Sequence, residues 1–227
     1  LSTHERLVSF LLEHYGGVGQ KLANAQLASN PFNVAYNNQL PWPAASGVFS
    51  IACVGRLDFN SKGQDILFEV LKQPQWKERP LRVTLYGEGP CKTALQRLKQ
   101  LHDLSQVTIA GHVNDMEAVW AEHHALLLPS RIEGMPLAAI EAMLCGRPCI
   151  VTDVAGCGGE LVQDGETGFV APALTTCLLN EAMERAWQAR DEWEEMGTLA
   201  RTRVRQLIPS NPALSFAERL IHIANSS

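Results

Sequence analysis

The sequence lacks the short motifs that mark several large classes of protein. Its six cysteines include no CxxC pair, its seven histidines include no HExxH, and no GxxxxGK[ST] loop occurs. These absences argue against a structural zinc site, a zinc hydrolase and a P-loop ATPase. No apolar run reaches 18 residues, so the sequence predicts no membrane-spanning helix. In a chain of this size, the cysteines are better explained as small buried apolar side chains of a reducing compartment than as disulfides.

The chain has no excess of positive charge: charged residues make up an ordinary 19%, aromatic residues 7%, and the formal net charge is -5. A net negative charge gives no sign of a surface that binds nucleic acid or an anionic membrane. Arg201, Arg203 and Arg205 form a local basic run at alternating positions of an expected helix, where we predict a solvated face. Hydrophobic residues make up 46% of the 227 residues, enough for one large domain or two small ones.

From residue 48 onward, short apolar segments alternate with segments of helical periodicity. Strands are expected at residues 48–54, 81–87, 107–111, 125–129, 148–154 and 167–172. Helices are expected at residues 62–73, 90–103, 115–124 and 136–145, and from 174 to 225 with breaks near Pro209 and Pro212. Continuously apolar strands that alternate with helices indicate a parallel sheet covered on both faces. The sequence therefore predicts a doubly wound, Rossmann-like α/β domain.

The first 47 residues do not follow this alternation. They contain a glycine-rich break, YGGVGQ, and an Asn- and Pro-rich stretch, NPFNVAYNNQLPWPAASG. We interpret residues 1–47 as a linker or the remnant of a preceding domain. The chain begins with Leu rather than Met, which we take as an indication of a longer parent protein.

Doubly wound sheets bind ligands at the carboxyl ends of their strands, so the loop after each strand is a candidate site. The loop after the first expected strand carries Arg56, and Lys62 opens the following helix. Two cations beside a helix N-terminus, with its free N–H groups, favour a phosphate. The alternative is that Arg56 pairs with Asp58 and that Lys62 is solvated.

Residues 133–141 read EGMPLAAIE, with a carboxylate at each end of an apolar segment. We expect Pro136 at the first helical position, with the amides of Met135 and Leu137 directed at an anion. Glu141 lies one turn after Leu137 on the same face, and Glu133 lies in the loop. Because a carboxylate accepts two hydroxyl hydrogen bonds, these groups suit a ligand with hydroxyls at both ends and phosphates between them. A nucleoside diphosphate sugar fits; the alternative is a chance pair of surface glutamates.

Several segments in the same order carry a wider pattern: VGRLDFNSKG, YGEGP, AGHV and PSRIEGMPLAAIEAMLCGRPCIVTDVAGCGGELVQDGETGFV. Together they resemble the C-terminal, donor-binding domain of the family-4-type retaining glycosyltransferases (glycosyl transferases group 1), which have the GT-B fold. The resemblance covers residues 48–172, and its most specific motif is Glu-x7-Glu with its G-x-P core.

The resemblance implies roles for individual residues. Arg56 and Lys62 would hold the donor diphosphate and neutralise the leaving group, with Glu133 on the donor sugar; we assign these three to catalysis. Glu141 would bind the ribose hydroxyls. Further donor contacts would come from Gly55, Gly111, His112, Val113, Ser130, Gly134, Met135, Pro136 and Leu137, with 111–113 beside the base. For His112 and Ser130, the alternative is that they only satisfy backbone groups.

The resemblance also implies the reaction, which is transfer of a hexose from a UDP-, GDP- or ADP-sugar to an acceptor hydroxyl with retention of configuration. The acceptor would be a glycan, a lipid-linked molecule or a small molecule, as in polysaccharide biosynthesis. No metal and no other cofactor is expected, because the cations and the helix N-terminus would act in place of Mg²⁺. We expect a cytoplasmic location, which leaves open peripheral binding to the inner membrane through an N-terminal domain.

A GT-B enzyme has two Rossmann-like domains, and this chain has room for one. We therefore expect residues 48–208 to form the nucleotide-sugar-binding half and residues 209–227 a C-terminal helix that crosses to a missing N-terminal acceptor domain. Alone, the chain should bind donor and transfer slowly or not at all. Two alternatives remain: a catalytically silent nucleotide-sugar-binding module, and a GT-B-fold sugar-nucleotide epimerase.

Overall fold

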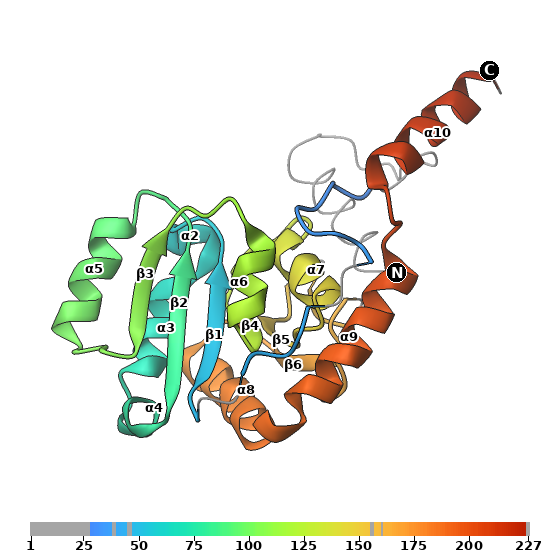
Figure 1. The fold of residues 1–227 in the computed structure, drawn as a ribbon. Helices are drawn as coiled ribbons and strands as arrows, with labels where there is room; N and C mark the ends of the chain where they lie inside the picture. Colours follow the sequence, from blue (N-terminus) through green and yellow to red (C-terminus); the bar gives the residue numbers. More distant parts are fainter. Residues whose placement is uncertain (1–27, 38–39, 45–46, 155–156, 160, 226–227) are drawn as a thin grey trace.

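A computed structural model describes residues 28–37, 40–44, 47–154, 157–159 and 161–225. In this part of the chain one six-stranded sheet forms the centre of the molecule (Figure 1). Its strands are β1 (Phe49–Val54), β2 (Leu81–Tyr86), β3 (Val107–Gly111), β4 (Ala125–Leu128), β5 (Cys149–Thr152) and β6 (Gly168–Ala171). The order is β3-β2-β1-β4-β5-β6 and every pairing is parallel. The predicted doubly wound α/β fold is confirmed.

Helices cover both faces of the sheet (Figure 1). They are α2 (Phe59–Lys62), α3 (Gln64–Leu71), α4 (Pro74–Glu78), α5 (Lys92–Leu101), α6 (Met116–Glu122), α7 (Leu137–Leu144), α8 (Thr176–Gln188), α9 (Trp193–Leu207) and α10 (Pro212–Asn225). A 3-10 turn, Arg190–Glu192, joins α8 to α9.

Two apolar cores result, one on each face of the sheet. In β1, Ile51 and Cys53 point into the core that α3 and α8 cover, whereas Ala52 points into the core that α6, α7 and α9 cover. Successive side chains of a strand face opposite sides, so a strand buried on both faces must be apolar throughout. This requirement explains the fully buried runs of the central strands β4 and β5, whereas β2 and the edge strand β3 are solvated in part and expose Arg82 and Thr108.

The sequence predicts a helix over residues 62–73 that Lys62 opens, and its start is wrong. Lys62 is the last residue of the separate short helix α2, and the chain breaks at Gly63, near the carboxyl end of β4, before α3 begins. Gly63 stands at the break with φ +63°, and a Cβ there would lie 2.1 Å from the carbonyl oxygen of Pro129. Only glycine permits both this backbone conformation and this approach. The short helix α4 was not predicted; it begins with Pro74, and the buried Trp76 donates a hydrogen bond to Asn180.

The described part of residues 1–47 packs against the domain. Val34 is buried in the core beside α7, and the hydroxyl of Tyr36 lies within hydrogen-bond distance of two carbonyl oxygens, those of Arg205 (3.0 Å) and Ile208 (3.1 Å). Farther along, the buried guanidinium of Arg147 donates to the carbonyl of Pro41 at 2.7 Å. Residues 32–40, where described, therefore pack on the α7–α9 side of the sheet, whereas Trp42 packs against the other core. Residues 1–27, 38–39 and 45–46 of the predicted linker or remnant lie outside the described residues.

For two arginines of the basic run on α9, Arg203 and Arg205, the prediction of a solvated face is wrong. Arg203 donates to the carbonyls of Leu161 and Gly159, and Arg205 donates to the carbonyl of Tyr36. These arginines thus fasten the loop after β5 and the segment before β1 to the same helix.

The cysteines follow the prediction only in part. Cys53, Cys145, Cys149 and Cys157 are buried free thiols, whereas Cys91 is half-buried and Cys177 is exposed. Burial raises the pKa of the Cys53 and Cys145 thiols to about 12, so both behave as small apolar side chains.

The predicted break near Pro209 and Pro212 is confirmed, since α9 ends at Leu207 and α10 begins at Pro212. Helix α10 points away from the sheet (Figure 1). Its exposed apolar side chains are Leu214, Phe216, Leu220, Ile221 and Ile223. Among the described residues, no helix combines the length and the apolar character that crossing a membrane requires.

Candidate functional site

A cavity of about 680 Å³ opens at the carboxyl ends of β1, β2 and β4. The strand order reverses between β1 and β4, and this is where doubly wound sheets bind ligands. Of the residues predicted from the sequence, those that line it are Gly55, Arg56, Lys62, His112, Val113, Glu133, Met135, Pro136, Leu137 and Glu141. Gly111, Ser130 and Gly134 were also predicted but are not lining residues. The sheet thus brings together side chains that lie far apart in the sequence.

The glycines of YGEGP let the loops on this edge approach one another closely. A Cβ on Gly87 would lie 2.0 Å from the carbonyl oxygen of Gly55, and one on Gly89 would lie 2.3 Å from that of Leu57. These glycines therefore serve backbone packing, which holds the loop after β1 against the end of β2.

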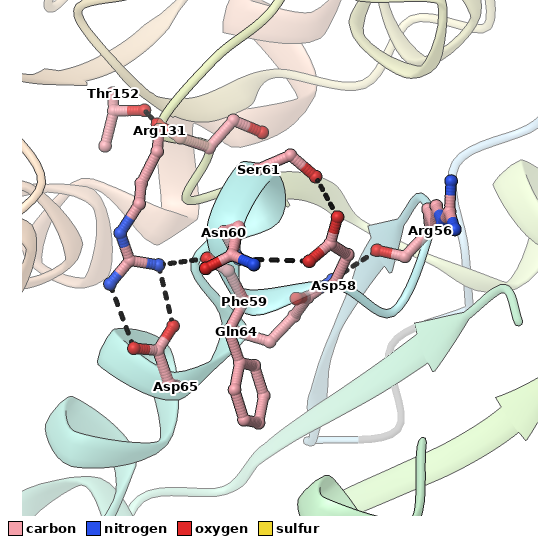
Figure 2. Close-up of polar contacts among 10 residues, drawn as sticks. Arg56, Asp58, Phe59, Asn60, Ser61, Gln64, Asp65, Arg131 and Thr152 are labelled. Carbon is pink, nitrogen blue, oxygen red and sulfur yellow. Dashed lines mark hydrogen bonds and ion pairs between the residues drawn. The ribbon is translucent and has the colours of Figure 1, made fainter. Parts of the chain in front are cut away.

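The loop after β1 is ordered by Asp58, which caps α2. Its carboxylate accepts hydrogen bonds from the amide of Asn60 and the hydroxyl of Ser61, both at 3.1 Å (Figure 2). The carbonyl of Arg56 accepts from the side chain of Gln64 at 2.9 Å, while the Arg56 side chain is exposed on the cavity wall. The contacts of Asp58 thus differ from the ion pair with Arg56 that was the alternative.

Arg131 joins the loop after β4 to the start of α3. Its guanidinium donates to both carboxylate oxygens of Asp65, at 2.8 and 2.9 Å, and to the carbonyl of Phe59 (Figure 2). The amides of Arg131 and Ile132 both donate to the carbonyl of Ser61. A bidentate Arg–carboxylate pair fixes orientation as well as distance. Arg131 therefore sets how close the loop that follows lies to α2.

As a result, Glu133 meets Lys62. The Lys62 Nζ–Glu133 Oε1 distance is 2.5 Å, and the hydroxyl of Ser130 donates to the same oxygen at 2.5 Å. Glu133 is only 7% exposed. The alternative of a solvated Lys62 is wrong, and Ser130 does more than satisfy backbone. Both contacts use Oε1, and within the described part of the chain Oε2 accepts no hydrogen bond.

The turn before α7 differs from the prediction. Pro136 is not the first helical residue but the N-cap, with φ −77° and ψ 77°. These angles are those of an inverse γ-turn, in which the amide of Leu137 donates to the carbonyl of Met135 at 2.9 Å. The Leu137 amide, predicted as a phosphate donor, is therefore engaged within the turn. The carbonyl of Pro136 accepts from Ala139 and Ile140 and so starts the helix.

Glu141 is 3% exposed and borders the cavity, so the alternative of a glutamate on the wet face of a helix is wrong. Its Oε1 accepts from the backbone amide of Asn33 at 2.9 Å and from the side-chain amide of Asn33 at 3.1 Å. Burial raises the pKa of Glu141, and the two hydrogen bonds from Asn33 act in the opposite direction. Sequence reasoning missed Asn33, because 108 residues separate it from Glu141 and no local pattern links them.

Other lining residues were also missed. Tyr86 ends β2 on the cavity wall, where burial, followed by the charge of Glu122, raises the pKa of its hydroxyl. Asn114 lines the cavity and its Oδ1 lies 2.9 Å from Nε2 of the exposed His112. Tyr86 is the first residue of YGEGP and Asn114 directly follows AGHV, which is the sequence signal that could have found them. Within the described ranges, no cluster of three or more His, Cys, Asp or Glu side chains could hold a metal ion.

The chain is similar in sequence to known proteins. The family model "Glycosyl transferases group 1" matches residues 48–189, more than half of the chain. The chain belongs to this family. It is 31% identical over 143 residues to N-acetyl-alpha-D-glucosaminyl L-malate synthase of Bacillus anthracis, covering 62% of this chain and 37% of that protein. It is 30% identical over 169 residues to D-inositol 3-phosphate glycosyltransferase of Gordonia bronchialis, covering 69% of this chain and 36% of that protein. The chain thus spans little more than a third of the length of these two relatives.

Solved structures agree on the fold. The chain superposes on S. aureus TarM, crystallised with UDP, with a TM-score of 0.77 at 19% identity over 93% of this chain and 41% of TarM. Sucrose-phosphate synthase from Thermosynechococcus elongatus also gives 0.77, at 24% identity over all of this chain and 58% of the synthase. At these identities the likeness shows the fold, and this group 1 glycosyltransferase chain has the fold of a GT-B C-terminal domain.

Proposed function

We propose that this chain binds a nucleoside diphosphate sugar and is the donor-binding half of a retaining hexosyltransferase. The observation that carries the proposal is the joint placement of Lys62, Glu133 and Glu141 on one cavity at the switch point of the sheet. Cations suit a diphosphate and carboxylates suit hydroxyls, so the wall matches a ligand that carries both.

In this proposal the ligand lies across the cavity. The ribose hydroxyls donate to Glu141, and the base lies beside His112 and Val113. The diphosphate lies between Arg56 and Lys62, and the donor sugar reaches Glu133 through Oε2, the oxygen that Lys62 and Ser130 leave for a hydroxyl. An ammonium group has three donors, so Lys62 can keep its bond to Glu133 and still donate to a phosphate oxygen.

The same arrangement supports the reaction. When the bond between the anomeric carbon and the diphosphate breaks, its electron pair goes to the phosphate oxygen. The new bond forms to the acceptor oxygen, whose proton passes to the departing diphosphate. Negative charge develops on the diphosphate, next to the preorganised charges of Lys62 and Arg56. We therefore propose that these two cations stabilise the leaving group without a metal ion or other cofactor.

The acceptor site is expected outside this chain, in another part of the whole protein. We propose that an N-terminal GT-B domain supplies the acceptor site and covers the apolar face of α10, whose exposed residues include Leu214, Phe216 and Ile221. The acceptor is a glycan, a lipid-linked molecule or a small molecule, in a pathway such as polysaccharide biosynthesis. By itself the chain should bind donor and transfer sugar slowly or not at all.

Calorimetric titration with UDP, GDP and ADP tests the proposal, with Glu141→Ala as the variant and Glu195→Ala as its control. Glu195 is exposed on α9, away from the cavity. One diphosphate should bind, and loss of the Glu141 carboxylate should weaken it about tenfold or more, as expected for hydrogen bonds to a charged group. The proposal fails if the folded chain binds none of the three, or if Glu141→Ala binds as Glu195→Ala does.

A further inference from the structure

Asn33 stands out among the residues before β1 because it reaches the cavity. It lines the cavity, and both its backbone amide and its side-chain amide donate to Oε1 of Glu141, at 2.9 and 3.1 Å. Asn33 lies outside residues 48–189, which match the family model. A segment that precedes the family domain thus contacts one of its two motif glutamates.

Both bonds to Glu141 fall on the same oxygen. An ionised carboxylate accepts hydrogen bonds and donates none, so the amide nitrogen of Asn33 must face it, as it does here. With Oε1 held by two donors, the plane of the carboxylate is fixed and Oε2 is directed elsewhere. The two bonds also favour the ionised form of a group that is 3% exposed, and in that form Oε2 carries no proton and only accepts hydrogen bonds from hydroxyls.

The segment around Asn33 is anchored independently of this side chain. Val34 is buried, the amide of Ala35 donates to Oε1 of Glu117 at 2.6 Å, and the amide of Asn30 donates to the sulfur of Met135 at 3.2 Å. Because these anchors use backbone groups and a neighbouring side chain, truncating Asn33 leaves the segment in place. The Asn33 side chain is therefore not required to hold the segment on the domain.

We propose that Asn33 is a positioning residue, which holds the carboxylate of Glu141 in the orientation that receives the ribose hydroxyls of the donor. The inference rests on the proposed function, since it assigns Glu141 to the ribose. It extends the donor site to residues that precede the first strand, so this segment contributes to nucleotide affinity without touching the nucleotide itself.

The test compares Asn33→Ala with Asn37→Ala, an exposed asparagine of the same segment. Each is titrated with the diphosphate that the wild-type chain binds and with its 2′,3′-dideoxy analogue, which offers Glu141 no hydroxyl. Asn33→Ala should weaken binding of the normal nucleotide about three- to tenfold. The change removes one hydrogen bond to the charged Glu141, and its effect on the ligand is indirect because it acts through Glu141. It should change affinity for the dideoxy analogue less than about twofold, as should Asn37→Ala for either ligand.

If Asn33 has a purely structural role, Asn33→Ala should weaken binding of the normal nucleotide and of the dideoxy analogue equally. That result overturns the proposal. Unchanged affinity for the normal nucleotide overturns it as well. In a Glu141→Ala background, where no acceptor for Asn33 remains, Asn33→Ala should cause no further loss of affinity for the normal nucleotide. If the wild-type chain binds and Glu141→Ala does not, but Asn33→Ala binds normally, only this inference fails. If the wild-type chain binds no nucleotide, the proposed function fails with it.

Discussion

Replacing Lys62 by Met should destabilise the protein more than replacing Glu133 by Gln, although both changes break the same ion pair. The two partners differ in exposure, because 21% of the Lys62 side chain and only 6% of the Glu133 side chain reach solvent. After Lys62→Met, a buried carboxylate keeps only the hydroxyl of Ser130 as a partner. After Glu133→Gln, the ammonium group of Lys62 can turn to water, and the new amide can still accept from Ser130.

The expected magnitudes follow from this asymmetry. Removing one partner of a fully buried ion pair costs about 3–5 kcal/mol in the free energy of unfolding. Lys62 is partly exposed and Glu133 keeps one hydrogen bond, so we expect about 2–3 kcal/mol for Lys62→Met and about 0.5–1.5 kcal/mol for Glu133→Gln. The double variant leaves no buried charge and should be more stable than Lys62→Met alone.

Urea unfolding followed by tryptophan fluorescence at neutral pH measures all three variants. Lys72→Met is the control, because Lys72 pairs with Glu69 at the surface, where their side chains are 39% and 41% exposed. A surface pair of this kind contributes about 0–1 kcal/mol. Equal destabilisation by Lys62→Met and Glu133→Gln, or a double variant less stable than Lys62→Met, would refute the reasoning.

The remaining predictions concern backbone strain and pH. Gly63→Ala should lower the free energy of unfolding by at least about 2 kcal/mol or prevent folding, because the methyl group would lie 2.1 Å from the Pro129 carbonyl oxygen and φ is +63°. Urea unfolding measures this, and a variant as stable as the wild type would contradict it. Burial lowers the pKa of His123 and His124, so these histidines favour the folded state above their unfolded pKa of about 6.5, and stability should fall as pH drops from 7 toward 5. Nδ1 of His124 accepts a hydrogen bond from the amide of Ser50, and protonation of Nδ1 removes this acceptor. His124→Asn supplies an acceptor that does not titrate, so stability should depend less on pH in this variant. An unchanged slope of stability against pH would exclude His124 as a cause.

The local sequence was sufficient for the elements that build the sheet. Each of the six predicted strands is present. The central strands β4 and β5 are buried throughout and apolar for that reason, whereas β2 and β3 expose Arg82 and Thr108 and were found from their short β-branched and apolar segments. The break at Gly63 was missed because its cause is the Pro129 carbonyl, which belongs to a strand end far along the chain. The short helix α4 was missed because its five residues are too few for helical periodicity to show.

For the candidate site, the sequence predicted which residues come together but not how they contact one another. The spacing of Glu133 and Glu141 and the cations after β1 predicted which residues face one cavity, because strand ends of a parallel sheet share an edge. The sequence could not predict partners within the site. The pairing of Lys62 with Glu133 depends on Arg131, which holds two loops together, and the contact of Asn33 with Glu141 depends on how the segment before β1 packs. The turn at Pro136 was misassigned by one residue, since proline suits both an N1 position and an inverse γ-turn.

The most direct test of the central claim is a crystal structure of the chain with the nucleoside diphosphate that calorimetry selects. The account predicts the ribose within hydrogen-bond distance of Glu141, the phosphates beside Lys62 and Arg56, and the base next to His112 and Val113. A nucleotide bound outside the cavity at the ends of β1, β2 and β4, or one whose ribose points away from Glu141, would contradict it.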